Sequence, residues 1–296
     1  MKPHTIDPSV RHDAVLFFDV VDGNPNGDPD GGNRPRVDEA TGHGLVTDVA
    51  IKRKIRDTIG FAAESLGYDL ARYQIFVEAG HALNTRAVES YTATGIQPNA
   101  KKLTPQQAET ARKWMTDRYV DVRLFGAVLS TGDTKALGQI RGPLQFGMAR
   151  SIDPAMPVSH AITRITQTRQ KDIDEGQSTE MGSKWTVPYA LYRAQFHYSA
   201  ALARRTGVTS EDLAALYHSL RFMFEHDRTA TRGIMTLRGL YVFNHSDAFG
   251  NAPVQPLLDR ITVKPTRDVP RAFSDYDIAD DLGDLPAGIT AEALHR

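Results

Sequence analysis

The sequence of 296 residues contains no cysteine. This absence excludes disulfide bonds, thiolate zinc sites and cysteine nucleophiles, and it is typical of proteins from a reducing compartment. The sequence also lacks any apolar run of the roughly eighteen residues that a membrane span needs, and its N-terminus has no signal-peptide core. We therefore expect a cytoplasmic protein without a membrane partner.

Several catalytic signatures are missing as well. The sequence has no G-x-S-x-G, no G-x-x-x-x-G-K-[ST] and no H-E-x-x-H, and its ten histidines are scattered. The segment STGDTKALG (residues 130–138) contains glycine and lysine at a spacing that does not suit a phosphate-binding loop. These absences argue against a serine hydrolase, a P-loop NTPase and a zinc protease. We expect neither a metal site nor a cofactor.

Charge is almost balanced overall, with a formal net charge of −1, but it is unevenly distributed. Residues 49–56, VAIKRKIR, carry four cations and no acid, and residues 135–171 form a second basic region. The segment from residue 274 onward is acidic instead, and we expect it to be a solvated tail. Local basic patches indicate an anionic partner more directly than the net charge does.

The segment VDGNPNGDPDGGNRPR (residues 21–36) resembles the start of an EF-hand calcium loop. The pattern D-x-[DN]-x-[DN]-G begins at Asp22, but Asn33 stands at the twelfth position, where a bidentate carboxylate is required. The preceding residues 14–21 have strand composition, whereas an EF-hand loop joins two helices. Calcium binding is the less favoured interpretation, and a loop rich in exposed amides indicates an anion instead.

The segment after this loop predicts an amphipathic helix. Thr47 or Asp48 can cap its start, and apolar side chains recur at steps of three and four at Ile51, Ile55, Ile59, Ala62 and Leu66. Lys52, Arg53 and Arg56 fall side by side on the flank of this stripe, so we expect them to project into solvent. The alternative is that they form an ordinary solvated helix face.

Further elements follow along the chain. Strands are expected at residues 73–79, 121–130, 141–151, 161–168, 185–200 and 233–244, and helices at 103–115 and 209–224. Thr104 and Gln107 form a capping box for the first of these helices, and Thr209 or Ser210 caps the second. Residues 81–102 show no clear period, and we interpret them as an irregular excursion.

This order reads β-α-β-β-α-β with long insertions, so we predict an α+β fold with a ferredoxin-like palm. The segment RGLYVF (residues 238–243) matches only the start of the aromatic strand of an RNA recognition motif, which makes base stacking on the sheet less favoured. A strand, an amide-rich loop and a helix with cations on one edge can instead hold a phosphate chain without reading its bases.

A second long insertion covers residues 163–188. Its cations and exposed-looking apolar residues are Arg169, Lys171, Lys184, Met181 and Trp185. A basic hairpin tipped with apolar side chains can insert between bases and kink a strand. A tryptophan at such a position can equally belong to the core.

The stretch from FFDVVDGNPNGDPDGGNRPRVD (residues 17–38) to GLVTDVAIKRKIRDTI (residues 44–59) closely resembles the type I-C branch of the Cascade backbone subunit, a RAMP-superfamily protein of CRISPR effector complexes. VRLFG (residues 122–126), GPLQFGMARSIDP (residues 142–154) and MGSKWTVPYALY (residues 181–192) also resemble blocks of this family. The resemblance spans most of residues 12–245 and does not extend to the acidic tail.

This resemblance implies a hand-shaped, RRM-like palm that carries a helical insertion and a thumb-like β-hairpin insertion. We accordingly expect the palm at residues 12–79, 136–162 and 186–265, the helical insertion at 80–135, the thumb at 163–188 and an acidic C-terminal extension at 266–296.

The family also implies a function. Copies of the subunit polymerise along the guide RNA (crRNA) in a helical filament, bind its sugar-phosphate backbone independently of sequence, and present its bases for pairing with target DNA. Other Cascade subunits are implied partners, namely a handle-capping subunit, a large subunit and a small subunit. The expected RNA-binding residues are Asn24, Asn26, Arg34, Thr47, Lys52, Arg53, Arg56, Arg141 and Arg169. The expected thumb residues, which kink the strand or contact guide or target, are Lys171, Met181, Lys184 and Trp185.

A RAMP endoribonuclease is the alternative function. Related backbone subunits of type III complexes use a loop aspartate to cut target RNA, and Asp28, Asp30 and Asp38 are present here. The resemblance to the type I-C branch argues against this alternative. We therefore expect a scaffold that has no catalytic residue and is not an enzyme.

Overall fold

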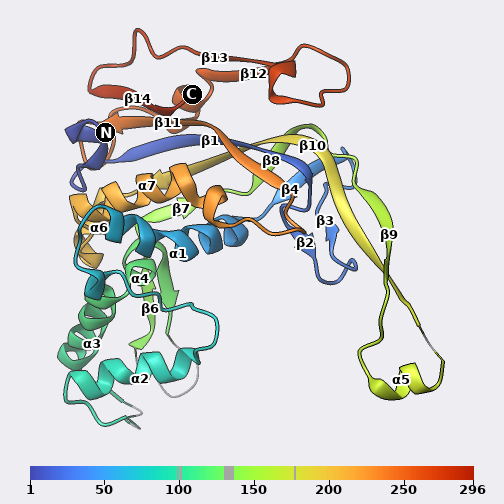
Figure 1. The fold of residues 1–296 in the computed structure, drawn as a ribbon. Coiled ribbons are helices and arrows are strands. Elements are labelled where there is room, and N and C mark those ends of the chain that lie inside the picture. Colours follow the sequence, from blue (N-terminus) through green and yellow to red (C-terminus); the bar gives the residue numbers. More distant parts are fainter. Residues whose placement is uncertain (99, 101, 130–136, 177) are drawn as a thin grey trace.

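The computed structural model describes residues 1–98, 100, 102–129, 137–176 and 178–296. Its centre is an antiparallel sheet (Figure 1) with the strand order β14 (Ile289–His295), β11 (Ile234–His245), β1 (His12–Gly23), β10 (Glu180–Tyr198), β8 (Ala149–Pro154) and β4 (His43–Val46). Two further strands, β7 (Leu144–Phe146) and β9 (Val158–Arg164), also pair with β10. The chain is therefore a mixed α+β protein, as the sequence predicts.

Strand β1 lies at the middle of this sheet and pairs along its length with β10 and β11. Its side chains alternate between two hydrophobic cores, since Leu16 and Phe18 belong to one and Val15 and Phe17 to the other. A strand that is covered on both faces needs apolar residues at successive positions. This double burial explains the continuous apolar run at the start of the sequence.

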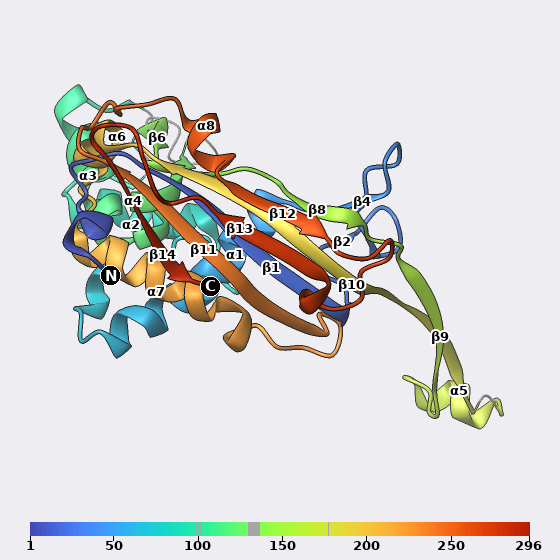
Figure 2. The ribbon, with the colours of Figure 1, turned by 90° about the horizontal axis from the view of Figure 1, so that it is seen from above.

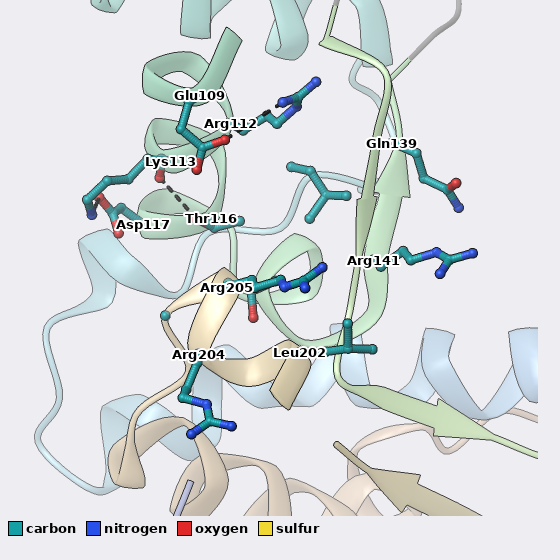
Figure 3. A pocket seen from close by; sticks show the side chains of 13 residues that line it. Glu109, Arg112, Lys113, Thr116, Asp117, Gln139, Arg141, Leu202, Arg204 and Arg205 are labelled. Atoms are coloured by element: carbon teal, nitrogen blue, oxygen red, sulfur yellow. Dashed lines mark hydrogen bonds and ion pairs between the residues drawn. The ribbon is translucent and has the colours of Figure 1, made fainter. Parts of the chain in front are cut away.

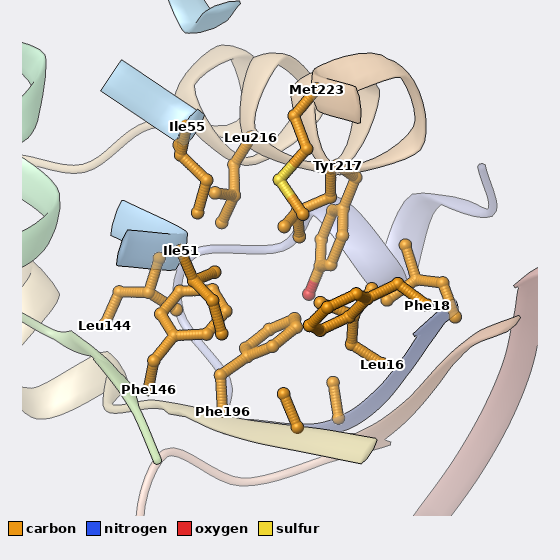
Figure 4. Close-up of a cluster of buried hydrophobic side chains, with 14 of the residues drawn as sticks. Leu16, Phe18, Ile51, Ile55, Leu144, Phe146, Phe196, Leu216, Tyr217 and Met223 are labelled. Atoms are coloured by element: carbon orange, nitrogen blue, oxygen red, sulfur yellow. The ribbon is translucent and has the colours of Figure 1, made fainter. Parts of the chain in front are cut away.

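Helices α1 (Asp48–Ser65) and α7 (Ser210–His226) cover one face of the sheet. Figure 4 shows Ile55 of α1 beside Leu216 of α7, and Ile51 of α1 beside Phe146 of the sheet. The predicted apolar stripe of α1 is confirmed at its first four positions, and the predicted N-caps Thr47 and Thr209 are confirmed as well. The expectation for Leu66 is wrong, because this residue forms the exposed C-cap.

The C-terminal part of the chain covers the opposite face, as Figure 2 shows from above. It consists of α8 (Val254–Leu258), the hairpin of β12 (Ile261–Pro265) with β13 (Tyr276–Asp280), and β14 at the sheet edge. Ile261, Tyr276 and Ile289 are buried there against β1 and β11 residues. The expectation of a solvated tail is therefore wrong, because apolar residues spaced among the acids anchor this segment to the sheet.

A separate helical part lies below α1 in Figure 1 and has its own small hydrophobic core. It contains α2 (Leu83–Ala93), α3 (Pro105–Arg118), α4 (Val120–Phe125) and the hairpin of β5 (Gly126–Val128) with β6 (Gln139–Arg141). The capping box of Thr104 and Gln107 at α3 is confirmed. Helix α6 (Ala200–Thr206) lies beside this part.

Three expectations for this region are wrong. Residues 81–102 contain helix α2 instead of an irregular excursion, and the apolar run from residue 121 begins as helix α4 instead of a strand. Residues 73–79 form no strand, apart from an isolated bridge between Gln74 and Tyr119. The end of the expected strand at residue 130 and the expected domain boundary at residues 135 and 136 lie outside the described residues.

Strands β9 and β10 continue as a long hairpin that projects from the sheet and carries α5 (Gln170–Asp174) at its far end (Figures 1 and 2). Its apolar side chains are unusually exposed, with Ile165 at 87% and Met181 at 82%. Near the base of this hairpin, the loop after β1 forms two short strands, β2 (Gly27–Asp28) and β3 (Arg34–Pro35). Within the described ranges, no helix has the length and apolarity that a membrane span requires.

Candidate nucleic-acid interface

The loop after β1 is fastened to the start of α1 through Asn26. The side-chain oxygen of Asn26 accepts hydrogen bonds from the amide of Thr47 at 2.9 Å and from its hydroxyl at 3.0 Å. The Thr47 hydroxyl oxygen in turn accepts from the amide of Ala50 at 3.2 Å, as an N-cap does. Asn26 and Thr47, which are both predicted to contact RNA, therefore hold the loop and the helix in one fixed arrangement.

Asn24 faces into the protein. Its side-chain amide donates to the carbonyl of Asn33 at 2.7 Å, and its backbone amide donates to Thr231 at 2.8 Å. Both amides of Asn24 thus have partners inside the protein, and its contact with RNA stays a prediction. A similar constraint holds at Gly27, where any Cβ would collide with the side chain of Asn33. These residues shape the loop from within.

The cationic side chains of α1 differ in their ion-pair partners and in their burial. Lys52 pairs with Asp48 at 2.9 Å and Arg53 pairs with Asp57 at 2.8 Å, both one turn apart on the helix. Such pairs contribute only about 0.3–0.5 kcal/mol, so a phosphate can replace the carboxylate at little cost. The neighbouring Lys54 is buried against Asp227, and it does not belong to the basic surface that the sequence indicates.

Arg56 does not project freely into solvent, contrary to expectation. Its side chain is only 13% exposed, and its Nε donates to Asp121 at 2.9 Å. Asp121 is 2% exposed and also accepts hydrogen bonds from the amides of Phe76 and Val77. Arg56 therefore ties α1 to the helical part of the chain. Nothing in the sequence singles out Asp121, because the apolar residues around it indicate a strand.

Lys52, Arg56 and Arg141 nevertheless come together, as the walls of one open cavity of about 650 Å³ between α1, β5 and β6. Phe125 forms part of its wall, and the charged groups of Lys52 and Arg56 lie 5.8 and 5.1 Å from its ring centre. Arg141 is exposed on β6. Three of the sequence-predicted contact residues thus share a basic concavity, although one of them also has a structural role.

A second meeting point lies between the loop and the base of the long hairpin. The guanidinium of Arg34 on β3 lies 5.5 Å from the ring centre of Trp185 on β10. Lys184, next to this tryptophan, donates from its ammonium to the carbonyl of Ala230 at 2.6 Å. Trp185 is half-buried, so it belongs neither fully to the core nor to an exposed tip.

The remaining predicted thumb residues lie farther out. Met181 pairs with Thr163 along the hairpin, and Lys171 lies on α5 with its ammonium 3.6 Å from Glu175. Arg169 is exposed at the N-cap of α5, which its side chain does not cap. The predicted contact residues therefore divide into a group near α1 and a group along the projecting hairpin.

The aspartates of the loop have structural partners. Asp28 lies 3.3 Å from Arg36, and its Oδ1 accepts from the amide of Asp30 at 3.2 Å. Asp38 accepts from Arg150 at 2.8 Å, and this hydrogen bond lowers the pKa of the Asp38 carboxyl below its usual value. No group of three or more histidine, aspartate or glutamate residues in the described part of the chain is placed to hold a metal ion.

The chain is similar to several known proteins. The chain is 34% identical over 120 residues to a "CRISPR-associated protein Cas7" of Haloferax volcanii, a match that covers 40% of this chain and only 32% of that relative. Chains of two solved structures are similar at 16% identity. In a "CRISPR RNA-guided surveillance complex, pre-nicking", the TM-score is 0.47 over 79% of this chain and 78% of the other. In a "CRISPR RNA-guided surveillance complex", it is 0.46 over 84% and 74%.

The family description "CRISPR-associated protein Cas7" matches residues 10–281, which is nearly the whole chain. This match includes the loop after β1, helix α1, the projecting hairpin and most of the C-terminal layer. The chain therefore belongs to the Cas7 family of CRISPR-associated proteins.

Proposed function

We propose that this protein is the non-catalytic scaffold subunit of a type I-C CRISPR interference complex. It polymerises along crRNA, binds the sugar-phosphate backbone independently of sequence, and leaves the bases free to pair with target DNA. Its partners are crRNA, target DNA, further copies of itself and the handle-capping, large and small subunits of the complex. The observation that carries this proposal is the basic cavity beside the fastened loop after β1.

The strand order supports an RRM-like palm as the framework. In chain order, β1, β8, β10 and β11 are separated by α1 after the first strand and by α7 after the third. In the sheet they lie as β11, β1, β10 and β8, which is the order of a ferredoxin-like fold. Strand β8 takes the second position in this chain order, which the sequence assigns to residues 73–79.

The covered sheet supports backbone binding instead of base stacking. A standard RNA recognition motif stacks bases on aromatic residues of its open sheet face. Here Phe17, Tyr241 and Phe243 on that face are buried beneath the C-terminal layer. With the sheet closed, the surface cations are the groups left to hold RNA, and phosphate contacts carry no sequence information.

The loop and α1 supply the contacts. Asn26 and Thr47 fix the loop against the helix, so Lys52 and Arg53 start from a defined position. Arg141 lines the same cavity as Lys52. Preorganised cations of this kind lower the ordering cost of binding a flexible strand.

The projecting hairpin serves as the thumb in this proposal. Its exposed Ile165 and Met181 provide the apolar surface that can insert at a kink, and Arg169 and Lys171 provide charge. At its base, Arg34 and Trp185 link the hairpin to the loop. A thumb that closes over the strand therefore acts on the same loop that holds the backbone.

The proposed scaffold role is tested by two measurements on the purified protein. We expect RNAs of equal length and unrelated sequence to bind with dissociation constants within about threefold of each other, because phosphate contacts dominate. We also expect the number of bound copies to rise with RNA length in mass photometry. A strong preference for one sequence, or a single bound copy at every length, would contradict the proposal.

A cleavage assay tests the proposal that the subunit does not cut RNA. The assembled protein and guide are incubated with complementary RNA and magnesium, and the RNA is expected to stay intact. Asp28 and Asp38 have partners within the loop region, which favours structural roles for them. Regularly spaced cuts that disappear in Asp30→Ala would replace the scaffold proposal with an endoribonuclease.

A further inference from the structure

Helix α6 lies between two surface cavities other than the one beside α1, although the first of them shares Arg141 with that cavity. The first, of about 580 Å³, is bounded by α3, β6 and α6, as Figure 3 shows. The second, of about 800 Å³, lies between α6, the end of β10 and the loop that follows β11. Leu202 and Arg204 line both cavities, so the two meet at this helix.

The first cavity has more positive charge than its own carboxylates neutralise. Glu109 lies 3.7 Å from Arg112, and Asp117 lies 2.5 Å from Lys113, so each acid has a cation on α3. The other cations of this cavity are Arg141, Arg204 and Arg205. Within the described residues, none of these three guanidinium groups has an ion pair or a hydrogen bond.

The uncompensated arginines come from different walls. Figure 3 shows the side chain of Arg205 extending from α6 toward β6, whereas the side chain of Arg141 extends from β6 away from Arg205, and Arg204 extends from another side of α6. Cations in the last turn of a helix also interact favourably with its dipole, which gives Arg204 and Arg205 a local reason to be there. The two charges are nevertheless left without a counter-charge where the two cavities meet, and this surplus of positive charge favours an anion there.

The second cavity adds an exposed aromatic ring. Phe249 is 91% exposed at the tip of the loop after β11. This loop is ordered, since the amide of Phe249 donates to Asp247 at 2.8 Å and the amide of Ser246 donates to Asn251 at 2.9 Å. An ordered loop that presents a bare ring beside an arginine is suited to stacking on a nucleobase.

We propose that α6 carries a binding track for single-stranded nucleic acid. Arg205 holds a backbone phosphate in the first cavity, Arg204 holds a phosphate where the cavities meet, and the ring of Phe249 stacks on a base in the second. A stacked base must be unpaired, so the ligand is a single strand. Arg204, Arg205 and Phe249 do not line the cavity beside α1, so this track does not depend on the proposed guide site.

Photo-crosslinking of the full-length protein tests this track. The probes are a uniform uridine RNA and a uniform thymidine DNA that carry thio-substituted bases, and crosslinked peptides are mapped by mass spectrometry. We expect crosslinks within residues 199–207 and 245–251, and the probe that gives them identifies the strand as RNA, DNA or either. Arg204→Ala with Arg205→Ala is expected to lower the salt slope of binding by about 1.4, and Phe249→Ala to weaken binding at least about fivefold.

Matched variants make the result specific. Arg267→Ala with Arg271→Ala removes the same charge from the exposed C-terminal layer, and Phe222→Ala removes an exposed ring on α7. Neither is expected to change the crosslinks, and circular dichroism melting verifies that each variant is folded. Lys52→Ala with Arg53→Ala is expected to remove only crosslinks within residues 21–56.

Two results would overturn the track. One is the absence of crosslinks within residues 199–207 and 245–251 with both probes. The other is an arginine variant on α6 that behaves like its matched control on the C-terminal layer. Crosslinks within residues 199–207 and 245–251 without any within residues 21–56 would support the track and contradict the proposed guide site. The experiment therefore distinguishes the failure of one proposal from the failure of the other.

Discussion

The guanidinium of Arg34 lies over the ring of Trp185, 5.5 Å from its centre. This contact joins the loop after β1 to the base of the projecting hairpin, two segments that are far apart in the sequence. A cation–π contact at a partly exposed position contributes about 0.5–1 kcal/mol. A phosphate that binds Arg34 can therefore displace this contact, so the proposed RNA binding at the loop would change the environment of Trp185.

Trp185 fluorescence is expected to report this coupling. The sequence has two tryptophans, so Trp114→Phe leaves Trp185 as the single emitter. Saturating RNA is expected to shift or intensify its emission, and Arg34→Ala is expected to remove most of that change. Arg36→Ala, which breaks the neighbouring pair with Asp28, serves as the control and keeps the response. An emission spectrum that RNA leaves unchanged in the Trp114→Phe protein would rule out the coupling.

Arg56→Ala is expected to destabilise the protein by about 3 kcal/mol. Removing one partner of a buried ion pair leaves the other charge uncompensated, and Asp121 is 2% exposed. Arg53→Ala removes the same side chain from an exposed pair on the same helix, and its effect is expected to stay within about 0.5 kcal/mol. Urea denaturation measures both. Equal losses of unfolding free energy in the two variants would contradict the structural role of Arg56.

Asn26→Ala is expected to cost about 1–2 kcal/mol of unfolding free energy, because the amide and the hydroxyl of Thr47 lose their shared acceptor. Asn26→Asp keeps an acceptor oxygen at this position and adds a negative charge near the N-terminus of α1, where it is favourable. It is therefore expected to be close to neutral. Thermal melts of the two variants measure this difference. An Asn26→Ala protein as stable as the wild type would contradict the structural role of the hydrogen bonds from Thr47 to Asn26.

Acidification is expected to destabilise the protein through His12. Burial lowers the pKa of His12 to about 4, and its ring lies 2.8 Å from the carbonyl of Asp7 and 3.0 Å from the hydroxyl of Tyr217. The unfolded state, with a pKa of about 6.5, binds a proton at higher pH than the folded state does. This contribution to stability is thus complete above about pH 6.5 and is lost as the pH falls toward 4.

The expected loss from His12 between about pH 7 and pH 5 is about 2 kcal/mol, measured as the free energy of unfolding. His12→Phe lowers stability at neutral pH but is expected to flatten this dependence. Burial also lowers the pKa of His218 and His295, so a smaller slope of the same sign remains in the variant. An unchanged slope in His12→Phe would show that the loss originates elsewhere.

The elements with strong local signals could be predicted from the sequence. Helix α1 has both an apolar stripe and an N-cap at Thr47, and α3 has a capping box, so these helices are as expected. The long apolar runs of β1 and β10 also gave correct strands. In each case the residues of one segment determine its structure without reference to a distant partner.

The errors arise where a distant residue decides the local structure. The amides of Phe76 and Val77 bind the carboxylate of Asp121, which satisfies them without a neighbouring strand. The same carboxylate holds Arg56, which the sequence indicates as a free surface cation. The same holds for the acidic C-terminal segment, because its few apolar residues, such as Tyr276 and Ile289, pack against a sheet face that the local sequence does not reveal.

The proposed sequence-independent binding of RNA through α1 is tested most directly in a salt series. Lys52→Ala with Arg53→Ala removes two cations whose helical ion pairs are weak, so stability is expected to be preserved. The slope of log affinity against log salt is expected to fall by about 1.4, which is about 0.7 for each lost contact with a single strand, equally for RNAs of unrelated sequence. Wild-type affinity and slope in this folded variant would contradict the assignment of α1 as the RNA-binding helix.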